Sequence, residues 1–136
     1  MSAAIEQLIP HRAPMRWIEA LTDCTDTEAT ATTIFHAEHF AVSEGRVLES
    51  ALVECMAQTV AAALGHRSRV AGKSGAANNG MLAAVSNFKI HSATTLDATI
   101  TIHVREVKRL GPMLMVTGKI YFGTTLIATG DLSLYA

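Results

Sequence analysis

The sequence predicts an α+β protein in which a curved antiparallel sheet wraps around one long apolar helix. One uninterrupted segment has the composition of a buried helix, and the segments after it alternate apolar and polar residues with the period of strands. The chain has 136 residues, of which 49% are hydrophobic and 17% are charged. That size and composition fit a single domain, residues 1–136, with one core.

The first third of the chain predicts one short helix and two strands. Residues 2–9 favour a helix with Ser2 as its N-cap, and Pro10 ends it because proline cannot continue a helix. Residues 15–35 are rich in threonine and apolar residues without a helical period, which indicates two strands. We expect residues 22–28 to connect them.

The most distinctive segment covers residues 47–64 and reads VLESALVECMAQTVAAAL. Alanine, leucine and methionine dominate it and neither glycine nor proline interrupts it, so it predicts a helix. From Ala51 onward it is apolar nearly all round, which is typical of a helix buried on most sides. Gly65 is the expected C-terminal stop, and the loop-like composition of residues 40–46 leads into the helix.

The rest of the chain predicts a loop and then a run of long strands. Residues 65–80 have a loop composition, and period-two alternation follows. The predicted strands cover residues 80–91, 95–110, 113–122 and 124–135. One apolar helix and one antiparallel sheet must bury each other, which is the hotdog arrangement. Its open edge strand favours dimerisation by pairing between sheets.

Composition also excludes several classes of protein. A net charge of −1 argues against nucleic-acid binding driven by the overall charge of the chain. The longest apolar stretch is interrupted by Glu54 and Gln58 and is too short to cross a bilayer, and the N-terminus does not resemble a signal peptide. Cys24 and Cys55 form no metal or disulfide motif, which favours a reducing compartment. We therefore expect a cytoplasmic protein that contacts neither nucleic acid nor membrane.

Glu54 is the strongest single candidate for chemistry. It lies in the middle of the predicted helix among apolar neighbours, where an isolated carboxylate is costly unless it is paired or protonated. Gln58 follows one turn later on the same face and is placed to hydrogen-bond it. The alternative is that Glu54 reaches the helix surface and is solvated.

Two histidine positions are further candidates. His36 and His39 begin and end the sequence H-A-E-H, but a metal site there lacks a third ligand and a regular helix to hold the spacing. His39 also fits a solvated loop. His11 lies between two prolines, and the simplest interpretation is a structural histidine that hydrogen-bonds a backbone carbonyl.

Taken together, several motifs resemble the 3-hydroxyacyl-acyl carrier protein dehydratases of the FabZ and FabA type, over nearly the whole chain. Residues 8–14 (LIPHRAP) are similar to the family's LPHRxP, His39-Phe40 to the HF of its GHFPG, and residues 54–58 (ECMAQ) to its EAMAQ. Asn-Phe-Lys-Ile at residues 87–90 is similar to the family's second half. The motifs PHRAPM and ECMAQ look like a divergent branch found in aryl-polyene and related polyketide-like clusters.

The resemblance implies a hotdog fold, dehydratase activity and a site shared between subunits. It places the catalytic histidine on His39 and the catalytic acid on Glu54, each from a different subunit of a dimer, with a helix N-terminal N–H at the substrate carbonyl. The chain departs from the family at three points. Residues 41–42 are Ala-Val instead of Pro-Gly, residues 48–49 are Leu-Glu instead of a second Pro-Gly, and the spacing from His39 to Glu54 is one residue longer.

The implied reaction fits these residue types. Loss of water from a 3-hydroxyacyl thioester needs a base for the C2 proton, here His39, and an acid for the C3 hydroxyl, here Glu54. We expect His11 and Gln58 to support the site and no metal or redox cofactor to take part. The expected partners are an acyl carrier protein or coenzyme A thioester and a second copy of the chain, in a homodimer or higher oligomer. The alternatives are a hotdog thioesterase, in which Glu54 activates water, and a non-catalytic acyl-thioester-binding subunit.

Overall fold

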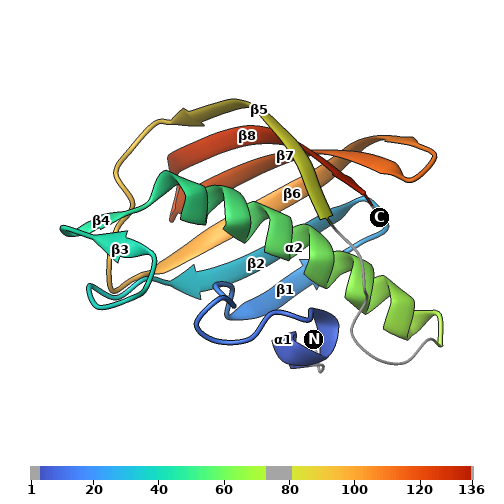
Figure 1. The fold of residues 1–136 in the computed structure, drawn as a ribbon, viewed down its shortest axis with the longest axis horizontal. Coiled ribbons are helices and arrows are strands. Elements are labelled where there is room, and N and C mark those ends of the chain that lie inside the picture. The colour runs from blue at the N-terminus through green and yellow to red at the C-terminus, as the bar shows by residue number, and fades with distance from the viewer. Residues whose placement is uncertain (1–3, 73–80, 136) are drawn as a thin grey trace.

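A computed structural model of the protein describes residues 4–72 and 81–135, and it shows one sheet wrapped around one long helix (Figure 1). The sheet is antiparallel, with the strand order β1-β2-β6-β7-β8-β5. A small β3-β4 hairpin precedes the long helix. The predicted α+β class and hotdog arrangement are therefore confirmed. The elements are α1 (Ile5–Leu8), β1 (Ala20–Cys24), β2 (Glu28–Ile34), β3 (Val42–Ser43), β4 (Arg46–Val47), α2 (Glu49–Val70), β5 (Met81–Ile90), β6 (Thr99–Leu110), β7 (Met113–Phe122) and β8 (Thr125–Tyr135).

Helix α2 is buried as its composition predicted, but both of its predicted ends are wrong. Residues 55–63 are all buried, so this stretch contacts protein on every side. Val47 belongs to the β3-β4 hairpin, where it pairs with Val42, and the helix begins two residues later at Glu49. Within residues 4–72 and 81–135, no helix combines the length and apolar character needed to span a membrane.

Gly65 does not end α2, as predicted, but lies inside the helix where α1 crosses it. A Cβ atom at this position would collide with the carbonyl oxygen of Leu8. Glycine is therefore required for the close approach of the two helices, and α2 continues to Val70. The predicted helix over residues 2–9 is also shorter, with Ala4 as N-cap, and Ser2 lies outside the described residues.

The sheet follows the predicted alternation. In β6, Ile100, Ile102 and Val104 are buried against the helix, whereas Thr101 and His103 lie on the opposite face. The boundaries of β6, β7 and β8 lie within four residues of the prediction. The predicted start of β5 at Gly80 falls outside the described residues. The connection between β1 and β2 is only residues 25–27, because both strands continue into the Thr-rich segment predicted as a turn.

Strand β5 forms an open edge of the sheet. It pairs with β8 on one side, and no described strand pairs with its other side. Its apolar side chains Met81, Val85 and Ile90 are exposed. An unpaired edge with exposed apolar side chains favours pairing with another chain.

Gly65 gives a prediction in which tertiary contact reverses the usual effect of a substitution. In an exposed helix Gly→Ala stabilises by about 1 kcal/mol, but at Gly65 the new methyl group would collide with backbone. We expect Gly65→Ala to destabilise the protein by about 1–3 kcal/mol in urea unfolding. Arg69→Ala, at an exposed position of the same helix, serves as the control and should change stability by only a few tenths of a kcal/mol. A stabilised Gly65→Ala protein would contradict this packing.

Candidate functional site

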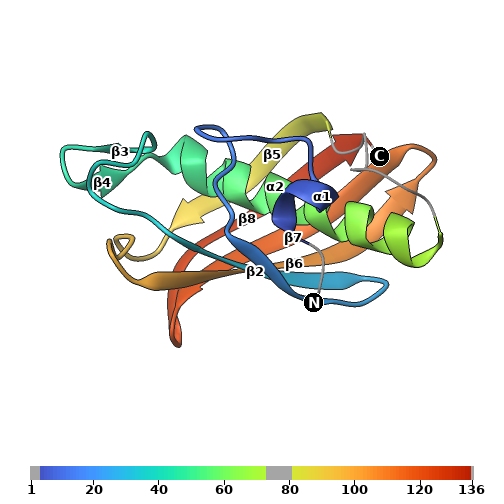
Figure 2. The same ribbon diagram turned by 90° about the horizontal axis from the view of Figure 1, so that it is seen from below.

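The segment between α1 and β1 runs across α2 (Figure 2). Gln58, which is 1% exposed, fixes this segment to the helix. Its Nε2 donates to the carbonyl oxygen of Met15 at 2.7 Å, and its Oε1 accepts from the backbone N–H of Trp17 at 2.9 Å. Its second N–H donates to Oε2 of Glu54 at 3.1 Å. Because both ends of the amide are held by backbone, Gln58 is oriented to bind the Glu54 carboxylate.

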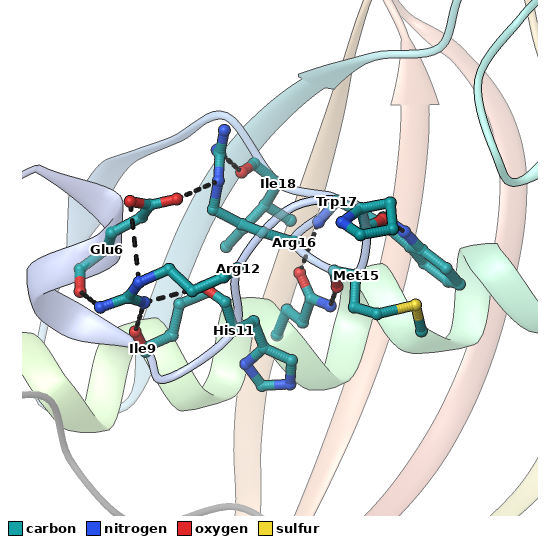
Figure 3. Close-up of polar contacts among 10 residues, drawn as sticks. Glu6, Ile9, His11, Arg12, Met15, Arg16, Trp17 and Ile18 are labelled. Carbon is teal, nitrogen blue, oxygen red and sulfur yellow. Dashed lines mark hydrogen bonds and ion pairs between the residues drawn. The ribbon is translucent and has the colours of Figure 1, made fainter.

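Arginine side chains give the same segment its shape (Figure 3). Arg12 donates from Nη1 to the carbonyl of Ile9 at 2.9 Å and from Nη2 to the carbonyl of Glu6 at 3.0 Å. The Glu6 carboxylate lies 3.7 Å from Nε of Arg12 and 3.3 Å from Nε of Arg16. The arginine of the PHRAP motif is thus a structural residue that the sequence analysis did not single out. In the sequence, this structural role is indicated by the position of Arg12 beside His11 in a proline-rich turn.

His11 faces Glu54 within the same chain. Its Nε2 lies 3.7 Å from Oε2 of Glu54, and the two side chains are 31% and 32% exposed. The other ring nitrogen, Nδ1, is buried and has no hydrogen-bond partner among the described residues. The expected hydrogen bond from this ring to a backbone carbonyl is therefore absent from the described structure. A neutral ring in this setting carries its proton on Nε2, toward the carboxylate, because an orphaned buried N–H is rarer than an unused acceptor.

Glu54 lies in the middle of α2, as predicted, but it is not buried. Its side chain is 32% exposed, so the alternative of a carboxylate that reaches the helix surface is the one observed. It accepts an N–H from Gln58. The apolar neighbours pack against the sheet on the other sides of the helix, which is why composition alone suggested burial.

His39 is half-buried beside aromatic rings. Its ring meets Phe35 edge to face with centroids 4.9 Å apart, and Trp17 at 6.4 Å. Its Nδ1 accepts the backbone N–H of Ala41 at 2.9 Å. Burial lowers the pKa of His39 below its ordinary value, and the charge on His36 lowers it further. Trp17 connects this ring to the Glu54 group, because the backbone N–H of Trp17 bonds Gln58. No hydrogen bond or ion pair joins His39 directly to Glu54 in the described part of the chain.

His36 and His39 have different hydrogen-bond partners. His36 Nδ1 lies 2.7 Å from Oδ1 of Asp97, and this hydrogen bond raises the pKa of His36. Among residues 4–72 and 81–135, no group of three or more His, Cys, Asp or Glu side chains is placed to hold a metal ion.

A cavity of about 360 Å³ lies at the N-terminal end of α2, between the β3-β4 hairpin and the loop after β5. Arg46, Glu49, Leu52 and Ile90 contribute to its lining, whereas Glu54, His11 and His39 do not. Leu52 and Glu54 are about 200° apart around the helix axis, at about 100° per residue. The cavity and the Glu54 carboxylate thus lie on different sides of α2 in one chain.

Gln58 gives a prediction for stability. Gln58→Met keeps the side-chain volume but leaves the buried N–H of Trp17 and the carbonyl of Met15 without their partner, so we expect a loss of about 1–3 kcal/mol in urea unfolding. Thr59→Val is the matched control. Thr59 is equally buried, and its hydroxyl bonds only the carbonyl of Cys55, which already belongs to the helix. Equal effects of the two changes would contradict the anchoring role of Gln58.

Comparison with solved structures supports the fold. The dehydratase heterocomplex ApeI:P from Xenorhabdus doucetiae is similar with a TM-score of 0.88 and 19% identity, covering 99% of this chain and 91% of that chain. The uncharacterised protein PH1136 from Pyrococcus horikoshii has a TM-score of 0.70 and 12% identity, covering 98% and 93%. A hypothetical thioesterase with coenzyme A from Streptococcus pneumoniae has a TM-score of 0.66 and 12% identity, covering 85% and 83%.

The sequence itself identifies the family. No curated protein sequence is significantly similar to this chain. The model of the ApeP-like family, described as ApeP dehydratase, nevertheless matches residues 3–136. This match includes both the PHRAP segment and the helix that carries Glu54, and it confirms the resemblance to hotdog dehydratases. The chain therefore belongs to the ApeP-like family.

Proposed function

We propose that this protein is a (3R)-hydroxyacyl-acyl carrier protein dehydratase, which eliminates water from a 3-hydroxyacyl thioester in fatty-acid or polyketide-like biosynthesis, including the aryl-polyene kind. The observation that carries the proposal is the Glu54 carboxylate, which is reachable from solvent and held by an immobilised amide beside an imidazole. Membership of the ApeP-like family supports the same reaction.

The reaction needs one proton to be removed from C2 and one to be given to the hydroxyl oxygen on C3. The C2–H bond and the C3–O bond break, a C2=C3 double bond forms, and the proton leaves with the hydroxyl as water. Glu54 and His39 are the proposed catalytic residues, and His11 and Gln58 support Glu54. The protein has to supply only proton transfers and hydrogen bonds for this reaction, and these side chains can supply both.

We further propose that the working form is a homodimer or higher oligomer paired through the β5 edge. Among the described residues of one chain, no hydrogen bond or ion pair joins His39 to Glu54, and neither side chain lines the cavity at the start of α2. A second subunit that supplies His39 across the interface would complete the site. The substrate would then arrive as a thioester of an acyl carrier protein or of coenzyme A.

The first prediction of this proposal concerns Glu54. Glu54→Gln keeps size and hydrogen bonding but cannot transfer a proton, so we expect the fold to survive and turnover to fall by about 10² or more. The assay is mass spectrometry of a 3-hydroxyacyl carrier protein before and after incubation, where dehydration gives the enoyl thioester. Asp26→Asn, an exposed carboxylate in the turn between β1 and β2, is the control and should keep full turnover.

The products also separate the alternatives. Free acid instead of the enoyl thioester would make the protein a thioesterase, with Glu54 activating water. Stable binding of the thioester with no product would make it an acyl-thioester-binding subunit. Full turnover by Glu54→Gln would place the catalytic acid or base elsewhere.

The second prediction concerns assembly. We expect sedimentation at micromolar concentration to show a dimer of 14.5 kDa chains. Val85→Lys, which places a charge on the exposed apolar edge of β5, should shift the protein toward monomer. Val107→Lys is the control, because Val107 is also exposed but lies on β6 at a distance from that edge in strand order. A 14.5 kDa species alone for the unmodified protein would contradict edge pairing.

A further inference from the structure

The backbone N–H of Ala41 determines which nitrogen of His39 carries the proton. Ala41 is 0% exposed, so its N–H needs an acceptor inside the protein. The acceptor is Nδ1 of His39, at 2.9 Å. A ring nitrogen that accepts a hydrogen bond carries a lone pair. We therefore assign the proton of the neutral His39 ring to Nε2.

The nearby backbone carbonyls already accept other N–H groups. The backbone N–H of His39 donates to the carbonyl of His36, and that of Val42 donates to the carbonyl of His39, each at 2.9 Å. The carbonyl of Ala41 accepts the N–H of Leu48, also at 2.9 Å. If Nδ1 carried a proton, two donors would face each other and the buried Ala41 N–H would lose its partner. A buried backbone N–H without a partner is costly, so this arrangement is disfavoured.

The other nitrogen of the ring is available. In the part of the chain that the structure describes, Nε2 of His39 has no hydrogen-bond partner, and it is not among the fully buried polar atoms. The aromatic rings of Phe35 and Trp17 hold the imidazole in place. His39 therefore presents a fixed N–H donor at Nε2 to an incoming group.

We propose that His39 is the hydrogen-bond donor to the thioester carbonyl and that Glu54 is the base. This inference rests on the proposed dehydratase function and replaces the expected division of roles. Glu54 takes the proton from C2 while Nε2–H of His39 stabilises the enolate oxygen. The protonated Glu54 then gives that proton to the C3 hydroxyl as the C3–O bond breaks. Water leaves, the double bond forms, and Glu54 returns to its carboxylate.

The surroundings of both residues agree with these roles. A base must be reachable and correctly oriented, and Glu54 is partly exposed while its Oε2 accepts the N–H of the anchored Gln58 amide. A neutral imidazole held with one defined N–H is a suitable donor to a developing oxyanion, because the donor is already oriented before charge appears. The same ring is a poor base at Nε2, since that atom already carries its proton.

The tautomer is tested directly by ¹⁵N NMR of the histidine side chains in the intact protein. We expect Nε2 of His39 to give the signal of a protonated nitrogen and Nδ1 that of an unprotonated one. Ala41→Pro removes the N–H, so the ring should lose this single tautomer. Ala41→Gly keeps the N–H and serves as the control, with an unchanged spectrum. A protonated Nδ1 in the unmodified protein would overturn the inference, whatever its activity.

The role is tested by two replacements of His39 in the carrier-protein assay. His39→Gln retains an amide N–H near the position of Nε2 but has no basic nitrogen, whereas His39→Leu has neither. Removing an oxyanion donor costs about 10²–10³ in rate, so we expect His39→Leu to fall by that factor and His39→Gln to retain at least tenfold more turnover. Sedimentation and thermal melting confirm that both variants are folded.

The outcomes separate this inference from the proposed function. Equal loss in His39→Gln and His39→Leu, with enoyl product from the unmodified protein, would make His39 the base and overturn the inference alone. Full turnover by both variants would remove His39 from the reaction. Absence of enoyl product from the unmodified protein would instead overturn the dehydratase proposal, while the NMR result would still establish or reject the tautomer.

Discussion

Burial of α2 in the concave face of a single sheet is the constraint on which the rest of the structure depends. The helix is apolar on nearly all sides, so one sheet face cannot cover it. The segment between α1 and β1 covers part of what remains, and Gln58 fastens that segment by hydrogen bonds to backbone atoms of Met15 and Trp17. These bonds let a polar side chain be buried in the helix at little cost, because both ends of its amide are satisfied.

The candidate site lies where this cover ends. Glu54 is one turn before Gln58 on the same helix, at the border between the covered and the open side. The amide that anchors the loop has one N–H left, and that N–H reaches the carboxylate. The side chain that holds the N-terminal segment on the helix therefore also orients the proposed base. The ion pairs of Arg12 and Arg16 with Glu6 stabilise the conformation of the loop that carries His11.

The two candidate histidines differ in how their environment fixes them. His11 faces a carboxylate and has no partner at its buried nitrogen within the described residues, whereas His39 is oriented by a backbone N–H and two aromatic rings. The Ala41 N–H exists because alanine stands where the resembled family motif has proline. By the inference above, this backbone N–H assigns the proton of the neutral His39 ring to Nε2.

The sequence by itself determined the class of each long element. Helical composition over residues 47–64 and period-two alternation after residue 80 are local properties, and burial on the expected faces follows from them. The i, i+4 spacing likewise predicted the Glu54–Gln58 contact. Tertiary structure decided what depends on distant residues: the helix crossing that keeps Gly65 inside α2, the exposure of Glu54, the position of His11 beside it, and the loop geometry that aims the Ala41 N–H at His39. None of these features leaves a periodic signal in the sequence. Each depends on the distance between two atoms, and that distance is set by contact between distant segments or by the path of a loop.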